Sequence, residues 1–359
     1  MNQQNFHALL TLGVKKGASD IHLQAGYPPA YRINGNLYSA KMEPFRPEDT
    51  QAAVELIMAE RGLPPDADEI DCGYSIPGVS RFRANIYRQR GSFGMVMRVI
   101  PFELPTLESL NLPHVISRIA DAHQGLILVT GATGEGKSTT IAALLNKMNA
   151  SEHLHIITVE DPIEFLFPPG QAVVSQREVG RDTRSFKHAL RSAMRQDPDV
   201  LMVGELRDSE TAETCLKAAE TGHLVISTLH TMDVMRSISR FAGMFPTEEQ
   251  LLVRGRLADS LRAIVSLRLL PRADGRGLVP ACEVLLNSIS IAQSIRDPAR
   301  TSEIPSLLER SADDLGTQTF DQHLLQLCRR GIITAEVAKS HATSPNEIQR
   351  ALSLDPSEM

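Results

Sequence analysis

Four short apolar runs recur in the second part of the chain and alternate with stretches of helical periodicity. Runs of this length, rich in β-branched residues, are typical of strands buried on both faces. Their alternation with helices predicts a mostly parallel sheet covered by helices on both sides, followed by a hairpin and, from about residue 288, a helical region. The expected strands are Leu126–Thr130, His155–Val159, Val200–Val203 and Leu224–Thr228, and the hairpin joins Ser266–Leu270 to Val279–Leu286.

The first hundred residues have shorter apolar runs than the second part of the chain, and this pattern predicts a separate α+β domain. Helices are expected around Phe6–Lys16 and Pro47–Glu60, the second ending at the break Leu63-Pro64-Pro65. Asn34-Gly35 is a strong hairpin signal because both residues accept positive φ. The expected strands are Ile21–Leu23, Tyr31–Ile33, Asn36–Tyr38, Arg81–Arg88 and Met95–Ile100.

A proline-rich segment separates the two patterns. Pro101 and Pro105 each restrict the backbone of the residue before them, which favours an extended connection. A chain of 359 residues is long for one core, so two domains are expected. We predict an N-terminal domain over 1–100, a linker over 101–111 and a second domain over 112–359.

Composition narrows the class of protein. Hydrophobic residues make up 42% and charged residues 22%, as in an ordinary globular protein, and the net charge of −6 argues against a broad nucleic-acid surface. A basic channel inside an oligomer would escape that argument. The chain shows neither an apolar run of about eighteen residues nor a signal-peptide layout at its start. Its four cysteines lack metal-ligand spacing, which is typical of reduced thiols, so we expect a cytoplasmic protein.

The segment Gly131–Ser138 has the pattern of a phosphate-binding loop between a strand and a helix. Its glycines let successive backbone N–H groups point at phosphate oxygens, and the helix N-terminus adds to the attraction. Lys137 would reach the β- and γ-phosphates, and Ser138 would ligate Mg²⁺. A glycine-rich turn ending in Lys-Ser would not explain the flanking strand and helix. The expected nucleotide-binding residues are Gly131, Thr133, Gly134, Glu135, Gly136, Lys137, Ser138 and Thr139.

Acidic residues follow two other predicted strands. Glu160 and Asp161 come after the strand that begins at His155. At that position they could hold Mg²⁺ or orient a water molecule. The alternative is a solvated acidic loop, which would have the same sequence pattern. Glu205 follows the strand that ends at Val203. We expect it to position the hydrolytic water, the alternative being an ordinary acid at a helix N-terminus.

Histidines and arginines complete the candidate set. His223 precedes and His230 follows the strand Leu224–Thr228, and His230 could sense the γ-phosphate. A histidine taken singly is more often a packed or surface residue. Arginines in the last strands of the first domain read either as a solvated basic edge or as arginine fingers that reach a neighbouring subunit. The candidates are Arg81, Arg83 and Arg98.

Taken together, these motifs resemble the secretion ATPase superfamily, specifically the PilT/PilU branch of type IV pilus motors. The resemblance covers nearly the whole chain, from Gly17–Leu23 onward, and includes four signatures in the family order. These are Walker A at Gly131–Ser138, the Asp box at Thr158–Phe165, Walker B at Asp199–Glu205 and the His box at Thr221–His230.

The resemblance implies a PAS-like α+β domain followed by a RecA-like P-loop ATPase domain, assembled as a homohexamer. It implies ATP and Mg²⁺ as ligands, Glu205 as the catalytic glutamate, Glu160 as its metal or water partner, and the three arginines as fingers. His223 would belong to the nucleotide-binding set as part of the His box. The expected partner is the inner-membrane platform protein of the pilus machine, so the location would be cytoplasmic and peripheral at that membrane.

Three functions stay open at this point. The first is a motor for pilus retraction and twitching motility. The second is an accessory PilU-like paralogue that depends on a partner ATPase, since Gln293 stands where PilT motors carry an arginine. The third is a RecA-like nucleic-acid motor. Glu135 departs from the family pattern of a small or hydroxyl residue, and its carboxylate would repel the triphosphate unless it points outward.

Overall fold

The computed structural model describes residues 1–33, 35–61, 68–100 and 103–353, and the chain divides into two compact units. The first unit contains residues 1–104 together with two short later segments, 161–166 and 178–182, and the second contains the rest. Asn34 of the expected turn, the Leu63–Pro65 break and the first two residues of the expected linker lie outside the described residues.

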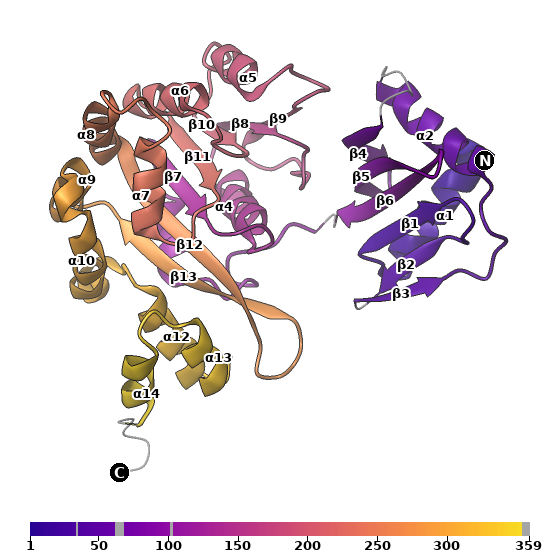
Figure 1. The fold of residues 1–359 in the computed structure, drawn as a ribbon. Helices are drawn as coiled ribbons and strands as arrows, with labels where there is room; N and C mark the ends of the chain where they lie inside the picture. The colour runs from indigo at the N-terminus through magenta and orange to yellow at the C-terminus, as the bar shows by residue number, and fades with distance from the viewer. Residues whose placement is uncertain (34, 62–67, 101–102, 354–359) are drawn as a thin grey trace. The chain divides into compact units, whose positions relative to one another are not determined.

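The first unit is built on a six-stranded sheet with the order β3-β2-β1-β6-β5-β4 (Figure 1). Its neighbouring strands pair antiparallel, so the sheet consists of two three-stranded meanders, β1-β2-β3 and β4-β5-β6, joined where β1 pairs with β6 at the centre. Its strands are β1 (Asp20–Gln24), β2 (Ala30–Ile33), β3 (Asn36–Ser39), β4 (Glu69–Ile76), β5 (Ser80–Gln89) and β6 (Ser92–Ile100).

Helices α1 (Gln3–Lys15) and α2 (Pro47–Arg61) share a core with this sheet. Alternate strand residues such as Met95 and Met97 are fully buried there, because side chains two apart point to the same face of a strand. The α1 N-terminus is capped by Asn2, whose side chain accepts the Asn5 N–H at 2.8 Å.

The second unit contains a seven-stranded sheet with the order β13-β12-β7-β11-β10-β8-β9 (Figure 1). The central pairings, β12–β7, β7–β11, β11–β10 and β10–β8, are parallel, as expected for strands separated by helices. The β12–β13 hairpin at one end of this sheet is antiparallel. The strands are β7 (Gly125–Thr130), β8 (His155–Glu160), β9 (Val173–Glu178), β10 (Val200–Val203), β11 (Leu224–Leu229), β12 (Leu261–Pro271) and β13 (Leu278–Leu286).

Each face of this sheet has its own core, because successive residues of a strand point to opposite sides. Ile127 and Val129 of β7 pack with α3 (His114–Ile119) and α4 (Lys137–Ser151). Leu126 and Leu128 pack on the other face. The helices there are α5 (Phe186–Ala193), α6 (Ser209–Glu220), α7 (Val234–Ala242), α8 (Gln250–Ser260), α9 (Ile289–Arg296) and α10 (Ile304–Arg310).

The C-terminal helices form a smaller core on the β12–β13 hairpin. Phe320 and Leu324 of α12 pack with Leu270 and Val279 of the hairpin. The remaining elements of this part are a 3₁₀ helix (Pro298–Glu303), α11 (Ala312–Leu315), α12 (Phe320–Arg329), α13 (Ala335–His341) and α14 (Pro345–Ser353). The hairpin is therefore held at the far end of the sheet, beside the loop that follows β7.

Candidate active site

Four parallel strands of the second unit end at one edge of the sheet, and each is followed by a predicted site segment. In spatial order, β7 leads into Gly131, β11 into His230, β10 into Gly204-Glu205, and β8 ends at Glu160. The carboxyl edge of a parallel sheet is where ligands bind in such folds. Segments that are up to a hundred residues apart in the sequence thus meet along one edge.

The loop after β7 has the conformation that a phosphate cradle needs. Gly131, Gly134 and Gly136 have φ values of 148°, 87° and 85°, which side chains with a Cβ rarely adopt. At Gly131 an added Cβ would also lie 2.8 Å from the Leu267 carbonyl oxygen, so this glycine lets the loop approach β12 closely. Helix α4 begins directly after Gly136 and aims its N-terminus at the loop.

Lys137 is the cation of this loop. Its ammonium group donates to the carbonyl oxygens of Gly131 and Ala132, both at 2.8 Å, and the residue is only 8% exposed. These two hydrogen bonds hold the lysine side chain across the loop that would bind a triphosphate. Backbone amides, a helix N-terminus, this ammonium and the neighbouring Ser138 hydroxyl form a donor set that fits the charge of a triphosphate and its metal.

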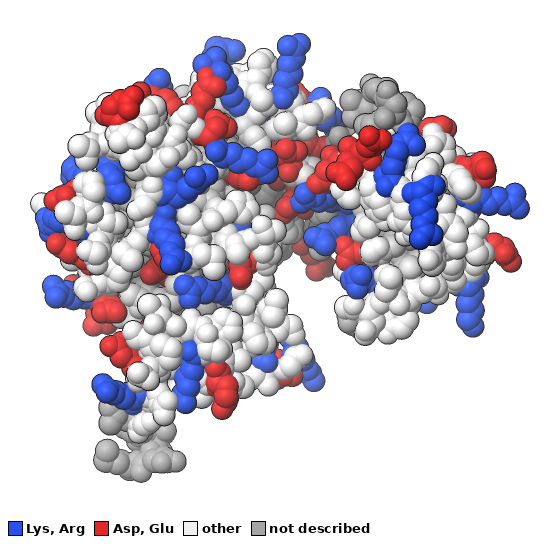
Figure 2. All heavy atoms as spheres, in the orientation of Figure 1, with Lys and Arg blue, Asp and Glu red and all other residues white. Residues whose placement is uncertain are grey.

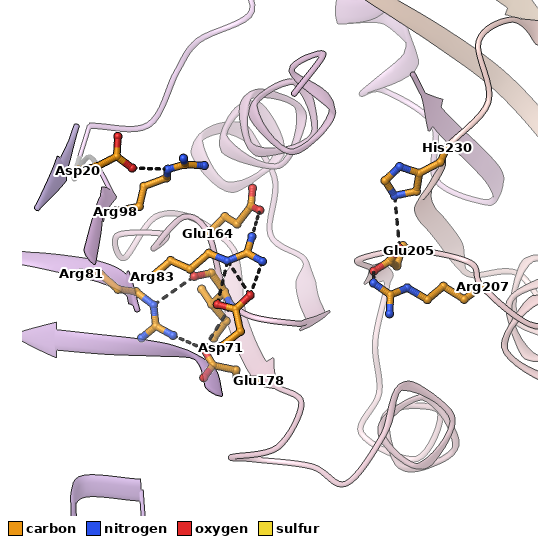
Figure 3. A network of polar contacts seen from close by, with 11 residues as sticks. Asp20, Asp71, Arg81, Arg83, Arg98, Glu164, Glu178, Glu205, Arg207 and His230 are labelled. Carbon is orange, nitrogen blue, oxygen red and sulfur yellow. Dashed lines mark hydrogen bonds and ion pairs between the residues drawn. The ribbon is translucent and has the colours of Figure 1, made fainter. Parts of the chain in front are cut away.

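His230, which follows β11, contacts Glu205, which follows β10 (Figure 3), and also contacts the phosphate loop. Its Nε2 lies 3.4 Å from a Glu205 carboxylate oxygen, and its Nδ1 lies 3.5 Å from the Thr133 hydroxyl. Arg207 contacts the other Glu205 oxygen at 2.5 Å. A cavity of about 450 Å³ opens here, lined by Glu205, Leu206, Arg207, Leu229, His230 and Arg240.

Arg207 and Arg240 were not among the sequence candidates. Arg207 stands two residues after Glu205, a spacing that could have drawn attention to it. Arg240 lies on α7, and its sequence neighbourhood carries no signal that it faces Glu205. Only the packing of α7 against the sheet brings it to this cavity.

Glu160 is buried at the end of β8, with 8% of its surface exposed. The Thr158 hydroxyl donates to Oε1 at 2.7 Å and the Gln176 amide donates to the same oxygen at 3.2 Å. Both donors hold the Glu160 carboxylate in place, and Gln176 was not among the residues predicted from the sequence. Asp161 groups with the first unit instead. Among the described residues no three His, Cys, Asp or Glu side chains form a cluster that could hold a metal by itself.

His223 lies away from the other candidates of the second unit. It precedes β11, and its carbonyl accepts the N–H of Gly125 at the start of β7, so it sits at the amino edge of the sheet. A strand of six residues spans about 20 Å, which separates His223 from the loop at Gly131. Within one chain His223 therefore does not reach the phosphate cradle, and contact with a nucleotide would require another subunit.

A second cavity, of about 560 Å³, borders the phosphate loop on the side of the β12–β13 hairpin. Its volume is in the range of small-molecule sites. Glu135 and Thr139 line it from the loop and α4, and the Glu135 carboxylate accepts the backbone N–H of Leu269 in β12. The carboxylate thus points at the hairpin strand. Other lining residues include Leu110, Asn111, Arg272, Leu278 and Pro280.

The three candidate arginines of the first unit differ in exposure and partners (Figure 3). Arg81 is buried, forms an ion pair with Glu178, and donates through Nε to the Ile163 carbonyl at 3.2 Å. Arg83 donates to Asp71, and these hydrogen bonds raise the pKa of its guanidinium. The side chain of Arg98 is 69% exposed and contacts Asp20 at 2.9 Å.

Asp20 responds to its surroundings in two opposing ways. Burial raises the pKa of its carboxyl, but hydrogen bonds from Arg98 and Ser19 outweigh burial and lower the pKa overall. Asp20 is therefore a stable anion that orients Arg98 at its otherwise exposed position.

Comparison with known proteins gives a consistent set of relatives. A family model described as type II/IV secretion system protein matches residues 3–340. The type IV pilus retraction ATPase PilT of Pseudomonas aeruginosa is 41% identical over 339 residues, which is 94% of this chain and 98% of that protein. The type IV pilus ATPase PilU of the same organism is 40% identical over 351 residues, 97% of this chain and 91% of that protein.

A solved structure shows the same fold. The crystal structure of the pilus retraction motor PilT with bound ADP matches with a TM-score of 0.85 at 41% identity, over 95% of this chain and 98% of that one. Within the described residues, none of the helices combines the length and the apolar character that crossing a membrane requires.

Proposed function

This chain belongs to the family of type II/IV secretion system proteins, and from that premise we propose that it is the motor of type IV pilus retraction. It is a P-loop ATPase, and the proposal is that it uses hydrolysis to drive pilus retraction and twitching motility. The observation that carries the proposal is the meeting of Lys137, Glu205 and His230 at one edge of the sheet, beside the positive-φ loop.

Each residue of this edge has a role that follows from its position. The loop amides and Lys137 would bind the β- and γ-phosphates, and the Ser138 hydroxyl would hold Mg²⁺ with the help of Glu160. When bound, the ion neutralises charge that develops on the phosphates. Glu205 orients the attacking water, and His230 senses the γ-phosphate from beside Thr133.

The second cavity fits the nucleoside part of the substrate. It begins at Thr139 and Glu135, where the phosphate loop ends. Its far wall combines the apolar residues Leu269, Leu278 and Pro280 with the charged residues Arg272, Asp274 and Arg276. Apolar walls with a few polar groups are typical of sites that hold a base and a sugar. The two cavities thus lie on either side of the loop, one for the reacting phosphate and one for the base.

Assembly is part of the proposal. We place the chain in a homohexamer that works from the cytoplasmic side on an inner-membrane platform protein, with arginines of the first unit reaching a neighbour's nucleotide. Arg98 and Arg83, which are at least one-third exposed, support a role between subunits better than the buried Arg81 does. His223 fits the same scheme as a residue that meets a nucleotide only across an interface.

The test of the hydrolytic site is a comparison of phosphate release and nucleotide binding. Lys137→Ala is expected to lose both, whereas Glu205→Gln is expected to bind ATP but to release phosphate at least ~10²-fold more slowly. Glu248→Gln, at an exposed position before α8, is the matched control. Undiminished turnover in Glu205→Gln would assign the water-orienting role to another residue.

A second function has specific support. The PilU relative is as similar to this chain as the PilT relative is, at 40% and 41% identity. An accessory subunit would hydrolyse ATP at an ordinary rate only when mixed with a partner ATPase. Turnover of the purified protein, alone and in such a mixture, separates this function from that of an autonomous motor.

The charge distribution does not support a nucleic-acid motor. On the face shown in Figure 2, the described Lys and Arg side chains are interspersed with Asp and Glu, and the chain carries a net charge of −6. Proteins that follow a phosphate backbone instead present a continuous basic groove.

A further inference from the structure

Glu135 connects the phosphate loop to a strand that is distant in sequence. Its carboxylate accepts the backbone N–H of Leu269, across 134 positions of the chain. The same region is closely packed, since an added Cβ on Gly131 would lie 3.2 Å from the Glu135 Cβ, and one on Gly136 would lie 3.8 Å from the Leu269 side chain. The loop therefore contacts β12 at Gly131, Glu135 and Gly136.

The Leu269 N–H is available because its neighbouring strand ends too early to pair with it. The β7–β12 pairing stops at Ser266 and Thr130, where β7 turns into the phosphate loop. On the opposite side of β12, Leu269 faces Pro280 of β13, which has no N–H to exchange. A pair in an antiparallel ladder exchanges both hydrogen bonds or neither, so this N–H points away from β13 and toward the loop.

The consequence is geometric. The β12–β13 hairpin forms the far wall of the 560 Å³ cavity, and the phosphate loop forms the near wall. Glu135 is the side chain that joins the two walls by a hydrogen bond. Without the Glu135 carboxylate, the Leu269 N–H would lose this acceptor, and the hairpin would lose this hydrogen bond to the loop.

We propose that Glu135 is a positioning residue that sets the distance between the phosphate loop and the nucleoside-side hairpin. The inference rests on the proposed function, because it takes the cavity beside the loop as the site of the nucleoside. A carboxylate in a phosphate loop is expected to repel the triphosphate, but the hydrogen bond from the Leu269 N–H directs the Glu135 carboxylate at β12. Glu135 therefore has a structural role in this proposal. Affinity for a nucleotide then depends on Glu135, whereas affinity for a bare triphosphate does not.

The test measures binding of two probes, ADP and inorganic triphosphate, to the full chain by calorimetry. Glu135→Ala is expected to bind ADP about tenfold more weakly, the usual effect of losing a hydrogen bond to a charged acceptor, with triphosphate binding unchanged. Glu135→Gln keeps a carbonyl acceptor for the Leu269 N–H, so it is expected to restore most of the ADP affinity. Glu248→Ala is the matched exposed control, and thermal melting shows that each variant is folded.

Three results would overturn the inference. If both Glu135 variants bind both probes more tightly, the carboxylate acts by repulsion. If both probes weaken equally in Glu135→Ala, the role is a general structural one, and if neither changes, the hydrogen bond has no effect on binding. A wild-type chain that binds ADP but never releases phosphate would refute the proposed function alone, because the two-probe comparison does not require hydrolysis.

Discussion

His230 and Glu205 face each other from adjacent strands, with 3.4 Å between Nε2 of the ring and a carboxylate oxygen. The histidine follows β11 and the glutamate follows β10, and the parallel register of these strands aligns their ends. Thr228 strengthens the junction, since its hydroxyl donates to the Gly204 carbonyl at 2.7 Å. The pair is therefore positioned by backbone pairing, and His230 connects it to Thr133 of the phosphate loop.

This relationship predicts the behaviour of His230→Ala. Removing the ring separates Glu205 from the phosphate loop, so we expect kcat for ATP hydrolysis to fall about 10²-fold, the usual effect of losing one preorganised polar group. ADP affinity should change little, because the ring lies at the reacting end. Steady-state phosphate release and calorimetry measure the two quantities, with the exposed His153→Ala as control. A rise in KM with unchanged kcat would instead make His230 a substrate-binding residue.

The buried ion pair between Arg81 and Glu178 predicts a stability effect. Arg81→Met leaves the Glu178 carboxylate buried and without its cation, which costs about 3–5 kcal/mol of unfolding free energy. All five tyrosines of the chain lie between Tyr27 and Tyr87, and the chain has no tryptophan, so tyrosine fluorescence in urea reports on the first unit alone.

The control for this prediction is Arg98→Met, which removes a largely exposed arginine and is expected to cost less than about 1 kcal/mol. Combining Arg81→Met with Glu178→Gln should recover part of the loss, because the uncompensated charge is gone. An Arg81→Met chain that unfolds like the wild type yet fails to hydrolyse ATP would support Arg81 as an arginine finger.

Local patterns in the sequence were sufficient for the fold class and for the sheet edge that carries the candidate site. The α/β prediction is confirmed, and so is the membership of a P-loop ATPase family. Strands β4 and β9 were not predicted. In β4 apolar residues do alternate, at Ile70, Cys72, Tyr74 and Ile76, but Asp71 and Gly73 between them are residue types depleted in strands. In β9 the polar run Ser175–Glu178 resembles a loop.

Features that depend on long-range pairing could not be predicted. Glu178 finds Arg81 across 97 positions, and the Glu135 carboxylate finds Leu269 only because β7 ends before β12 does. The separation of His223 from the phosphate cradle likewise depends on the arrangement of the strands in the sheet. Two histidines seven residues apart look equivalent in the sequence until the strand between them is known to place them at opposite edges of the sheet.

A buried hydroxyl network behind the phosphate loop predicts coupling between distant segments. The Ser237 hydroxyl donates to the Asp233 carbonyl at 2.6 Å and lies 2.7 Å from the Thr231 hydroxyl and 3.3 Å from the Thr130 hydroxyl. The Thr130 hydroxyl in turn lies 2.8 Å from that of Ser266. Ser237→Ala should cost about 1–3 kcal/mol of stability, because buried hydroxyls lose a partner. Far-ultraviolet circular dichroism in urea, with the exposed Ser239→Ala as control, measures the change.

A double-mutant cycle shows whether the network acts as a unit. Ser237→Ala and Thr130→Val should couple by about 0.5–3 kcal/mol, since each removes the other's partner. Strictly additive losses would mean that the two hydroxyls are stabilised by separate groups.

The final prediction concerns pH and two buried groups near β13. Burial raises the pKa of Glu283 to about 7, although its carboxylate accepts the Val234 N–H at 2.8 Å, and burial lowers the pKa of His323 to about 4. A raised carboxyl pKa favours the folded state below pH 4.5, and that stability is lost as pH rises to about 7. The lowered histidine pKa acts oppositely, adding stability as pH rises from about 4 to 6.5.

Glu283→Gln separates these opposing effects. The glutamine keeps an acceptor for Val234 but does not ionise, so its stability relative to the wild type should grow by about 3 kcal/mol between pH 4.5 and pH 8. Asp233, Arg268 and Asp321 also act on Glu283, and the substitution leaves them in place. Urea unfolding followed by circular dichroism at several pH values measures the difference. If the difference in unfolding free energy between Glu283→Gln and the wild type did not change with pH, Glu283 would have the same pKa in the folded and unfolded chains. The positive charge of Arg268 would then offset the effect of burial on that pKa.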